Sequence, residues 1–227
     1  MRTLLIFVLL ATTTYAHAEI KAWKNYFSGS INYQTSEFTL TFKKGEDSNR
    51  IIFSGEAVRA CLACGLSFFE EHGLSYDKNL ILDLRSQGGG NTVFHDFMGS
   101  LASKCEANLP NESYPVFFYD QFYSSYSSKT SDVKRCKLIT IVKPRQKCAS
   151  FCTALFQLGK ERIAYSDSRF GFHAASGNLL FDIIRFYNGL GVDLNWLNKN
   201  KEVFQTTDMT YFKGEQLTEN GMVTRLK

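Results

Sequence analysis

The chain has 227 residues, of which 44% are hydrophobic, and its formal net charge is +4 at pH 7. This apolar content is ordinary for a globular protein, and the length is enough for one sizeable domain with its own core. Basic residues are scattered, and the densest cluster, KPRQK at residues 143–147, is too short to be a nucleic-acid-binding tract. We therefore expect no nucleic-acid partner.

The beginning of the chain has the layout of a secretory signal peptide. Arg2 provides a positive charge, an apolar run (LLIFVLLA) covers residues 4–11, and Ala16 and Ala18 form an A-x-A cleavage site. The apolar run is shorter than the ~20 residues needed to span a bilayer. An uncleaved membrane anchor is the alternative. We expect a signal peptide at 1–18 and a single domain at 19–227. That domain would be exported, most naturally to a periplasm and otherwise secreted, with no membrane attachment after cleavage.

An even number of cysteines in an exported protein favours disulfide bonds. A bridge between Cys105 and Cys136 would close the ends of the segment at 106–135. A bridge between Cys148 and Cys152 would cross a short turn. The sequence does not choose among the possible pairings of its six cysteines, which are Cys61, Cys64, Cys105, Cys136, Cys148 and Cys152.

Zinc is an alternative use of two of these cysteines. Cys61 and Cys64 have the C-x-x-C spacing of many zinc sites. No second pair of this kind completes a set of four ligands, so we expect no metal and no cofactor.

Hydrophobic periodicity predicts strands and helices that alternate along the chain. The predicted elements of the first half are a hairpin over 26–42, a short strand over 51–53, a helix over 57–72, a buried strand over 79–84 and a helix over about 92–105. Those of the second half are a strand over 138–142, a helix over 150–158, strands over 162–165 and 170–173, helices over 179–190 and 192–204, and a C-terminal helix followed by a turn. This order predicts an α/β fold with a mainly parallel sheet that is covered on both faces.

The segment 106–135 interrupts the alternation. It contains Pro110, Pro115 and a dense group of aromatic residues (YPVFFYDQFYSSY) at 114–126. Such a segment can form a lid or an apolar substrate groove. The alternative is a surface loop that packs its own aromatic residues, or a contact in a homo-oligomer.

A glycine run, Gly88 to Gly90, follows the predicted strand over 79–84. Glycine allows the backbone to approach a ligand closely and to point N–H groups at it. Taken alone, a glycine turn after a strand is more often only a turn.

Ser150 lies in a turn of small residues that leads from a strand into an apolar helix. A serine at this position is often a simple N-cap. The same position also suits a nucleophile. The N–H of Phe151 and an N–H of the glycine run would then form an oxyanion hole.

His173 follows a short predicted strand and precedes a run of small residues. A single histidine is more often structural than catalytic. It is also the best general base near neutral pH, and pairing with a serine is what activates a hydroxyl nucleophile. We therefore regard Ser150 and His173 as the candidate catalytic pair.

Taken together, these segments resemble the Clp protease proteolytic subunit and crotonase superfamily. The resemblance is carried, in chain order, by IIFSGE at 51–56, ILDLRSQGG at 81–89, the strand and turn at 139–151, LFQLGKERIAYSDSRFGFH at 155–173 and FKGEQLTENGMV at 212–223. It covers roughly 51–223 and implies a crotonase-like fold of stacked ββα units. It also implies that Ser150 is the nucleophile, that His173 is the base, and that the amides of Gly89 and Phe151 form the oxyanion hole.

The chain departs from the family at the third catalytic position. The aspartate of the family falls two residues before the phenylalanine that matches Phe212, and here that position is Thr210. Asp208 lies two residues earlier and would need a register shift to orient His173. The segment between His173 and Thr210 is also shorter than the one that joins the two rings of Clp subunits. A double ring served by an ATP-driven partner is therefore not expected.

These patterns predict an exported, ATP-independent serine hydrolase, most simply a peptidase that acts on polypeptide or peptide. A binding or scaffold protein that keeps the fold without efficient catalysis is the main alternative. Crotonase-type chemistry on an acyl-thioester is a third reading, disfavoured because coenzyme A is not expected outside the cytoplasm.

Overall fold

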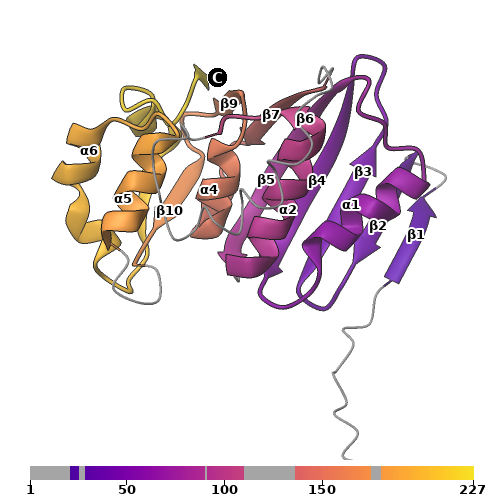
Figure 1. The fold of residues 1–227 in the computed structure, drawn as a ribbon, viewed down its shortest axis with the longest axis horizontal. Coiled ribbons are helices and arrows are strands. Elements are labelled where there is room, and N and C mark those ends of the chain that lie inside the picture. The colour runs from indigo at the N-terminus through magenta and orange to yellow at the C-terminus, as the bar shows by residue number, and fades with distance from the viewer. Residues whose placement is uncertain (1–20, 26–28, 90, 110–135, 175–179) are drawn as a thin grey trace, which may run out of the picture.

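The computed structural model describes residues 21–25, 29–89, 91–109, 136–174 and 180–227 (Figure 1). The predicted signal peptide at 1–18 lies outside the described residues. So does most of the segment at 106–135, including its aromatic group.

The described strands form one mixed, mostly parallel sheet, which confirms the predicted α/β class. Strands β1 to β4 are antiparallel neighbours, and β4, β5, β7, β9 and β12 follow as parallel neighbours. A branch of β8, β10 and β11 leaves this order at β5. The strands are β1 (Lys21–Asn25), β2 (Ser30–Gln34), β3 (Phe38–Lys43), β4 (Ser48–Ala57), β5 (Asn79–Gly89), β6 (Cys105–Glu106), β7 (Cys136–Val142), β8 (Lys147–Ala149), β9 (Glu161–Ala164), β10 (Arg169–Phe172), β11 (Thr210–Lys213) and β12 (Arg225–Leu226).

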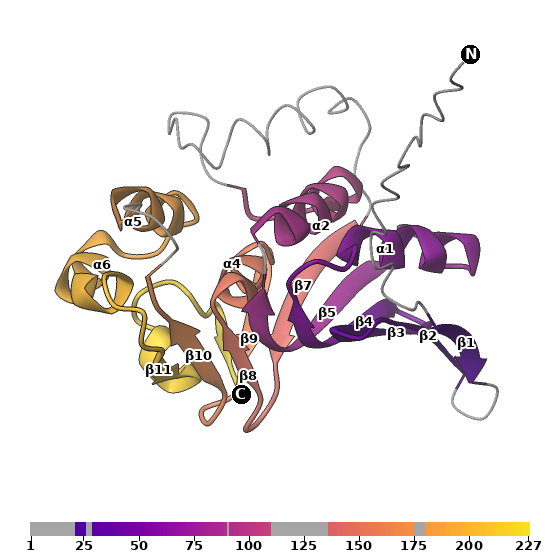
Figure 2. The same ribbon diagram turned by 90° about the horizontal axis from the view of Figure 1, so that it is seen from below.

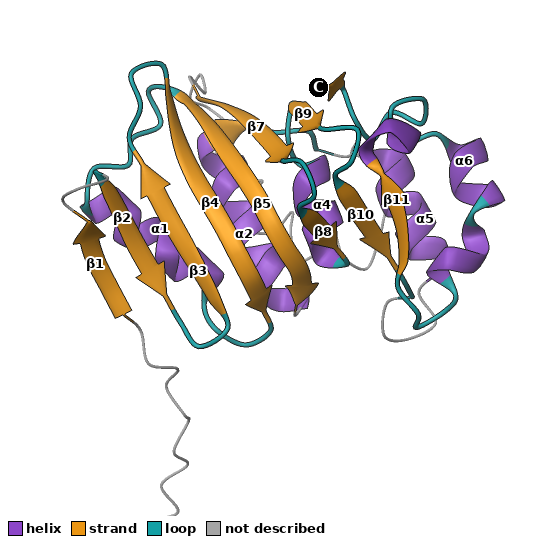
Figure 3. Ribbon diagram, turned by 180° about the vertical axis from the view of Figure 1, so that it is seen from behind, coloured by secondary structure: helices purple, strands orange, loops and turns teal. Residues whose placement is uncertain are grey.

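The helices α1, α2 and α4 lie on one face of this sheet (Figure 2). No helix of the described residues covers the opposite face of β2 to β5, so the expectation of a sheet covered on both faces was wrong there (Figure 3). The reason lies in the alternation along these strands, since the uncovered side carries partly exposed polar residues such as Thr39, Thr41 and Arg85. The helices are α1 (Leu62–Glu71), α2 (Asn91–Lys104), α4 (Phe151–Gln157), α5 (Leu180–Gly189) and α6 (Leu194–Lys199), with 3-10 turns η1 (Lys201–Phe204) and η2 (Gly214–Leu217).

A cluster of charges around one buried carboxylate joins three central strands. The carboxylate of Asp83 is fully buried, and it lies 2.9 Å from the ammonium of Lys143, 3.4 Å from Arg85 and 3.8 Å from Arg50. A buried carboxylate is tolerated only when it is paired, and these cations come from β4, β5 and the end of β7. The cluster therefore fixes these strands against one another.

Helix α1 begins five residues later than predicted, because the carboxylate of Glu37 accepts the backbone N–H groups that precede the helix. The backbone N–H groups of Val58, Arg59 and Ala60 donate to the carboxylate of Glu37 at 2.8, 2.9 and 3.0 Å. The helix then buries Leu62, Gly65, Leu66 and Phe69 against the sheet. Strands β4 and β5 are longer than predicted, because they pair with each other from Ser48 and Asn79 up to Ala57 and Gly89.

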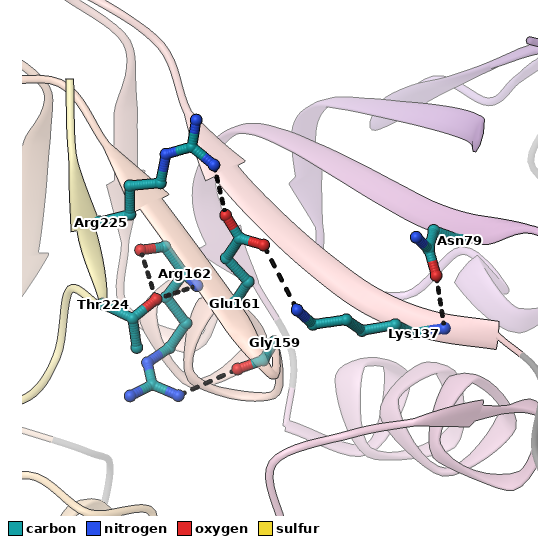
Figure 4. A network of polar contacts seen from close by, with 7 residues as sticks. All are labelled: Asn79, Lys137, Gly159, Glu161, Arg162, Thr224 and Arg225. Carbon is teal, nitrogen blue, oxygen red and sulfur yellow. Dashed lines mark hydrogen bonds and ion pairs between the residues drawn. The ribbon is translucent and has the colours of Figure 1, made fainter. Parts of the chain in front are cut away.

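The C-terminal segment forms β11, η2 and β12, where a helix followed by a turn was expected. Figure 4 shows how its end is fastened to β9: Arg225 bonds Glu161 at 2.9 Å, and Glu161 also bonds Lys137 at 3.4 Å. The nearly buried guanidinium of Arg162 donates to the carbonyls of Gly159, Gly221 and Met222 at 2.8–3.0 Å. A short isolated helix is only marginally stable, whereas pairing with β9 gives the end of this segment backbone hydrogen bonds within the sheet.

All six cysteines are paired, as Cys61–Cys64, Cys105–Cys136 and Cys148–Cys152. The disulfide prediction is confirmed, and the C-x-x-C pair forms a bridge instead of offering two thiolates to zinc. Three disulfides fit an oxidising, exported environment. Within the described ranges, no helix has both the length and the apolar character to cross a membrane.

Candidate active site

Two parallel strands deliver Ser150 and His173 to the same place. Strand β8 pairs with β10 so that Ala149 lies opposite Gly171. Ser150 directly follows β8, and His173 directly follows β10. Strands β8 and β10 run side by side (Figure 3), and because parallel strands end at the same edge of a sheet, the residues that follow them come close together.

The backbone of Ser150 has an unusual conformation. Its φ of 53° and ψ of −131° place a non-glycine residue at positive φ. Such a conformation costs about 1–3 kcal/mol and persists only when the surroundings impose it. Here the Ser150 N–H donates to the carbonyl of Gly171 at 2.9 Å, while its own carbonyl accepts the N–H of Thr153 at 2.9 Å.

The side chain of Ser150 does not cap helix α4, although this is the commonest role of a serine at a helix start. Its Oγ instead lies 2.8 Å from Nε2 of His173, which is hydrogen-bonding distance. Both residues are partly exposed, so a substrate can reach them. The arrangement has the geometry of a nucleophile next to its general base.

The structure does not bring Asp208 to the histidine. Asp208 is exposed, and its N–H donates to the hydroxyl of Thr206 at 3.0 Å in a tight turn. Among the described residues, no carboxylate comes within hydrogen-bonding or ion-pair distance of the His173 ring. Thr210 lies opposite Phe172 in the antiparallel pair of β10 and β11, so it occupies the strand next to the histidine.

The glycine run touches the serine turn through Gly88. Its φ is 104°, and a Cβ on this residue would come within 2.7 Å of the Ser150 Cβ and 3.3 Å of the Phe151 N. Only glycine fits this approach. The Gly88 N–H donates to the hydroxyl of Ser86 at 3.0 Å, whereas Gly89 backs onto Ala57, where a Cβ would lie 2.0 Å from the carbonyl oxygen. The sequence did not predict the close approach of Gly88 to Ser150, because a run of three glycines does not show which of them contacts the serine turn.

An apolar pocket opens beside Ser150 and has a cavity volume of about 70 Å³. Sequence reasoning missed most of its lining, because those residues come from α2, α5 and η1, far from the serine in the chain. Besides Ser150 and His173, it is lined by Met98, Phe151, Thr153, Ala154, Phe172, Ile183, Phe186, Tyr187 and Phe204.

One polar pair lies among these apolar groups. The hydroxyls of Thr153 and Tyr187 hydrogen-bond to each other, and Thr153 also donates to the carbonyl of Ser150 at 2.6 Å. Burial raises the pKa of Tyr187 far above its ordinary value, so it remains a neutral phenol. The pair therefore links the pocket to the serine turn without placing a charge there.

The disulfide between Cys148 and Cys152 spans the serine turn. Cys148 belongs to β8 and Cys152 to the first turn of α4, and both are fully buried. The two bonded residues therefore flank Ser150 at two positions before and two positions after it.

Comparisons with known proteins add little to this geometry. No family model matches the chain, and no curated protein matches it. One solved structure, described only as "Crystal structure of an Enzyme", is similar with a TM-score of 0.49 and 13% identity, over 78% of this chain and 94% of that chain. A likeness at this level says nothing of the activity of this chain.

Proposed function

We propose that the protein is an exported, ATP-independent serine hydrolase with a Clp/crotonase-like fold, most simply a peptidase. The single observation that carries this proposal is the 2.8 Å approach of His173 Nε2 to the Oγ of a serine held at positive φ. A serine that merely caps a helix needs neither feature. Three disulfides support an oxidising location, a periplasm or the space beyond it.

In this proposal Ser150 Oγ attacks the carbonyl carbon of the substrate while His173 Nε2 takes the hydroxyl proton. The same nitrogen then gives that proton to the departing amine. Water then attacks the resulting ester while His173 Nε2 takes one of its protons. That proton passes to the departing Ser150 Oγ, which regenerates the serine and releases the carboxylic acid product. In this proposal the N–H groups of Phe151, which directly follows the serine, and of Gly89 would hold the oxyanion.

The apolar pocket beside Ser150 supports a polypeptide substrate with a medium-sized apolar side chain next to the cleaved bond. A volume of about 70 Å³ lined by aromatic and aliphatic groups disfavours charged side chains.

The test is labelling of the purified mature protein with a fluorophosphonate probe, which reacts only with activated serines. We expect the wild type to label and both Ser150→Ala and His173→Ala to lose labelling. Ser67→Ala and His72→Ala, two exposed positions on and just after α1, are matched controls that should label normally. A correctly folded, disulfide-intact wild type that does not label would contradict the proposal.

A second candidate is a binding or scaffold protein of the same fold. It is favoured by one observation, the lack of a carboxylate at the His173 ring among the described residues. The orienting carboxylate is worth much of the rate in serine hydrolases. Absence of labelling in folded wild type, with Ser150 accessible, is the result this candidate predicts.

A further inference from the structure

Three features anchor the turn that carries Ser150. On its N-terminal side, Cys148 lies between two strands, opposite Phe170 of β10 and Ser86 of β5. On its C-terminal side, Cys152 lies in the first turn of α4, a helix of only seven residues. The disulfide joins these two sides directly across the serine.

The alternative conformation of this turn is easy to identify. A serine that precedes a helix ordinarily has a negative φ in the extended region and turns its hydroxyl to the N–H groups of the first helical turn. Ser150 instead has φ 53°, makes no such cap and points its hydroxyl at His173. A short tether between residues 148 and 152 opposes relaxation towards the capping conformation, because relaxation changes the distance between the tethered residues.

We infer that the Cys148–Cys152 disulfide is a positioning device that holds Ser150 in its reactive conformation, so that the hydrolase gains full reactivity only after export. This inference rests on the proposed function. The bond forms when two thiols lose two protons and two electrons to a disulfide oxidant of the receiving compartment, by thiol–disulfide exchange. In a reducing cytoplasm both cysteines remain thiols and the turn lacks its tether.

The chain contains a well-matched control disulfide. Cys61–Cys64 also closes a very short loop, with a sequence separation of 3 against 4 for Cys148–Cys152. It lies at the start of α1, outside the serine turn, and its two cysteines are exposed. Loss of either bond frees a similar number of residues in the unfolded chain, so a difference in reactivity reports on position and not on chain entropy.

The experiment compares mature wild type with the double variants Cys148→Ala/Cys152→Ala and Cys61→Ala/Cys64→Ala, each checked for folding by circular dichroism. Fluorophosphonate labelling should slow by roughly 10- to 100-fold in the first variant, because a small misplacement of a nucleophile has effects of this size. The second variant should label like wild type. The imidazole nitrogen NMR signals of His173 should also change only in the first variant, since they report the hydrogen bond to Ser150.

A titration of wild type with dithiothreitol tests the same inference if the first variant does not fold. The exposed Cys61–Cys64 bond should be reduced first with no change in labelling, and labelling should fall only as alkylation detects reduced Cys148 and Cys152. Equal labelling of wild type and a folded Cys148→Ala/Cys152→Ala variant would overturn the inference alone. A fall in labelling that follows Cys61–Cys64 would also overturn it. Wild type that never labels would remove the proposed function and this inference with it.

Discussion

Thr210 lies directly opposite Phe172 in the antiparallel pair of β10 and β11, and Phe172 is the residue immediately before His173. It occupies the place where resemblance to Clp subunits puts an aspartate. We predict that Thr210→Asp increases the second-order rate of fluorophosphonate labelling by roughly tenfold or more, because a carboxylate fixes the tautomer and orientation of a catalytic imidazole. Thr210→Asn is the control for shape without charge. Equal rates for the aspartate and asparagine variants would contradict the prediction.

Asp208 is predicted to be dispensable. Its side chain is exposed and makes no contact with His173, and its backbone is held in a turn by Thr206. Asp208→Ala should therefore label at the rate of wild type, and its thermal stability should change little, as is usual for an exposed position. A strong loss of labelling would show that Asp208 moves to the histidine during the reaction.

The pocket should select substrates by the size of their apolar group. Ala154 lines it from α4 and is 4% exposed, so a larger side chain there takes up space next to Ser150. We predict that Ala154→Leu lowers kcat/KM for an ester with a medium-sized apolar acyl group by roughly 10- to 100-fold while an acetyl ester is affected much less. Ala63→Leu, on α1, is the matched control. Parallel losses for both esters would mean that the substitution disturbs Ser150 itself.

The order of most helices and strands was predictable because each one shows its own hydrophobic periodicity in the sequence. The serine turn and the histidine strand were found from local patterns of small residues next to apolar runs, and the parallel pairing of β8 with β10 brings the two together. Boundaries were less predictable. Helix α1 starts late because Glu37, 25 residues before Leu62, accepts the N–H groups that precede the helix. No local pattern reports a partner so distant in the chain.

The site was only partly predictable for a similar reason. The pocket residues of α5 and η1 look like ordinary core positions in sequence, and only the tertiary fold places Tyr187 and Phe204 beside Ser150. The C-terminal strands were missed because β12 has just two residues, too few for any periodicity. Its pairing with β9 depends on contacts made by Glu161 and Arg162 (Figure 4).

The Cys105–Cys136 bond should contribute most to global stability. It closes a loop with a sequence separation of 31, and its two residues lie opposite each other in β6 and β7. From the loss of chain entropy in the unfolded state, Cys105→Ala/Cys136→Ala should lower the free energy of unfolding by about 3–4 kcal/mol, against about 2 kcal/mol for Cys61→Ala/Cys64→Ala. Urea denaturation of the two variants, with the remaining disulfides intact, measures the difference. Equal losses would contradict this loop-length argument.

Glu37 should make stability depend on pH in the acid range. Partial burial acts to raise the pKa of Glu37, but the three backbone N–H hydrogen bonds that it accepts, with the charge of Arg59, lower it below the ordinary value of 4.5. A carboxyl group whose folded pKa is lowered stabilises the fold above its unfolded pKa, and this contribution is lost as the pH falls through the folded value.

We therefore predict that Glu37→Gln lowers the free energy of unfolding by about 1 kcal/mol at neutral pH, a modest value because the group is largely solvated. The difference from wild type should begin to shrink as the pH falls below 4.5, where the unfolded chain takes up a proton, and should vanish below the lower folded pKa, where Glu37 is protonated in both states. Urea denaturation at a series of pH values measures it, with Glu46→Gln at an exposed turn as the control. A difference that stays constant down to strongly acid pH would show that the loss in Glu37→Gln does not come from the charge of Glu37.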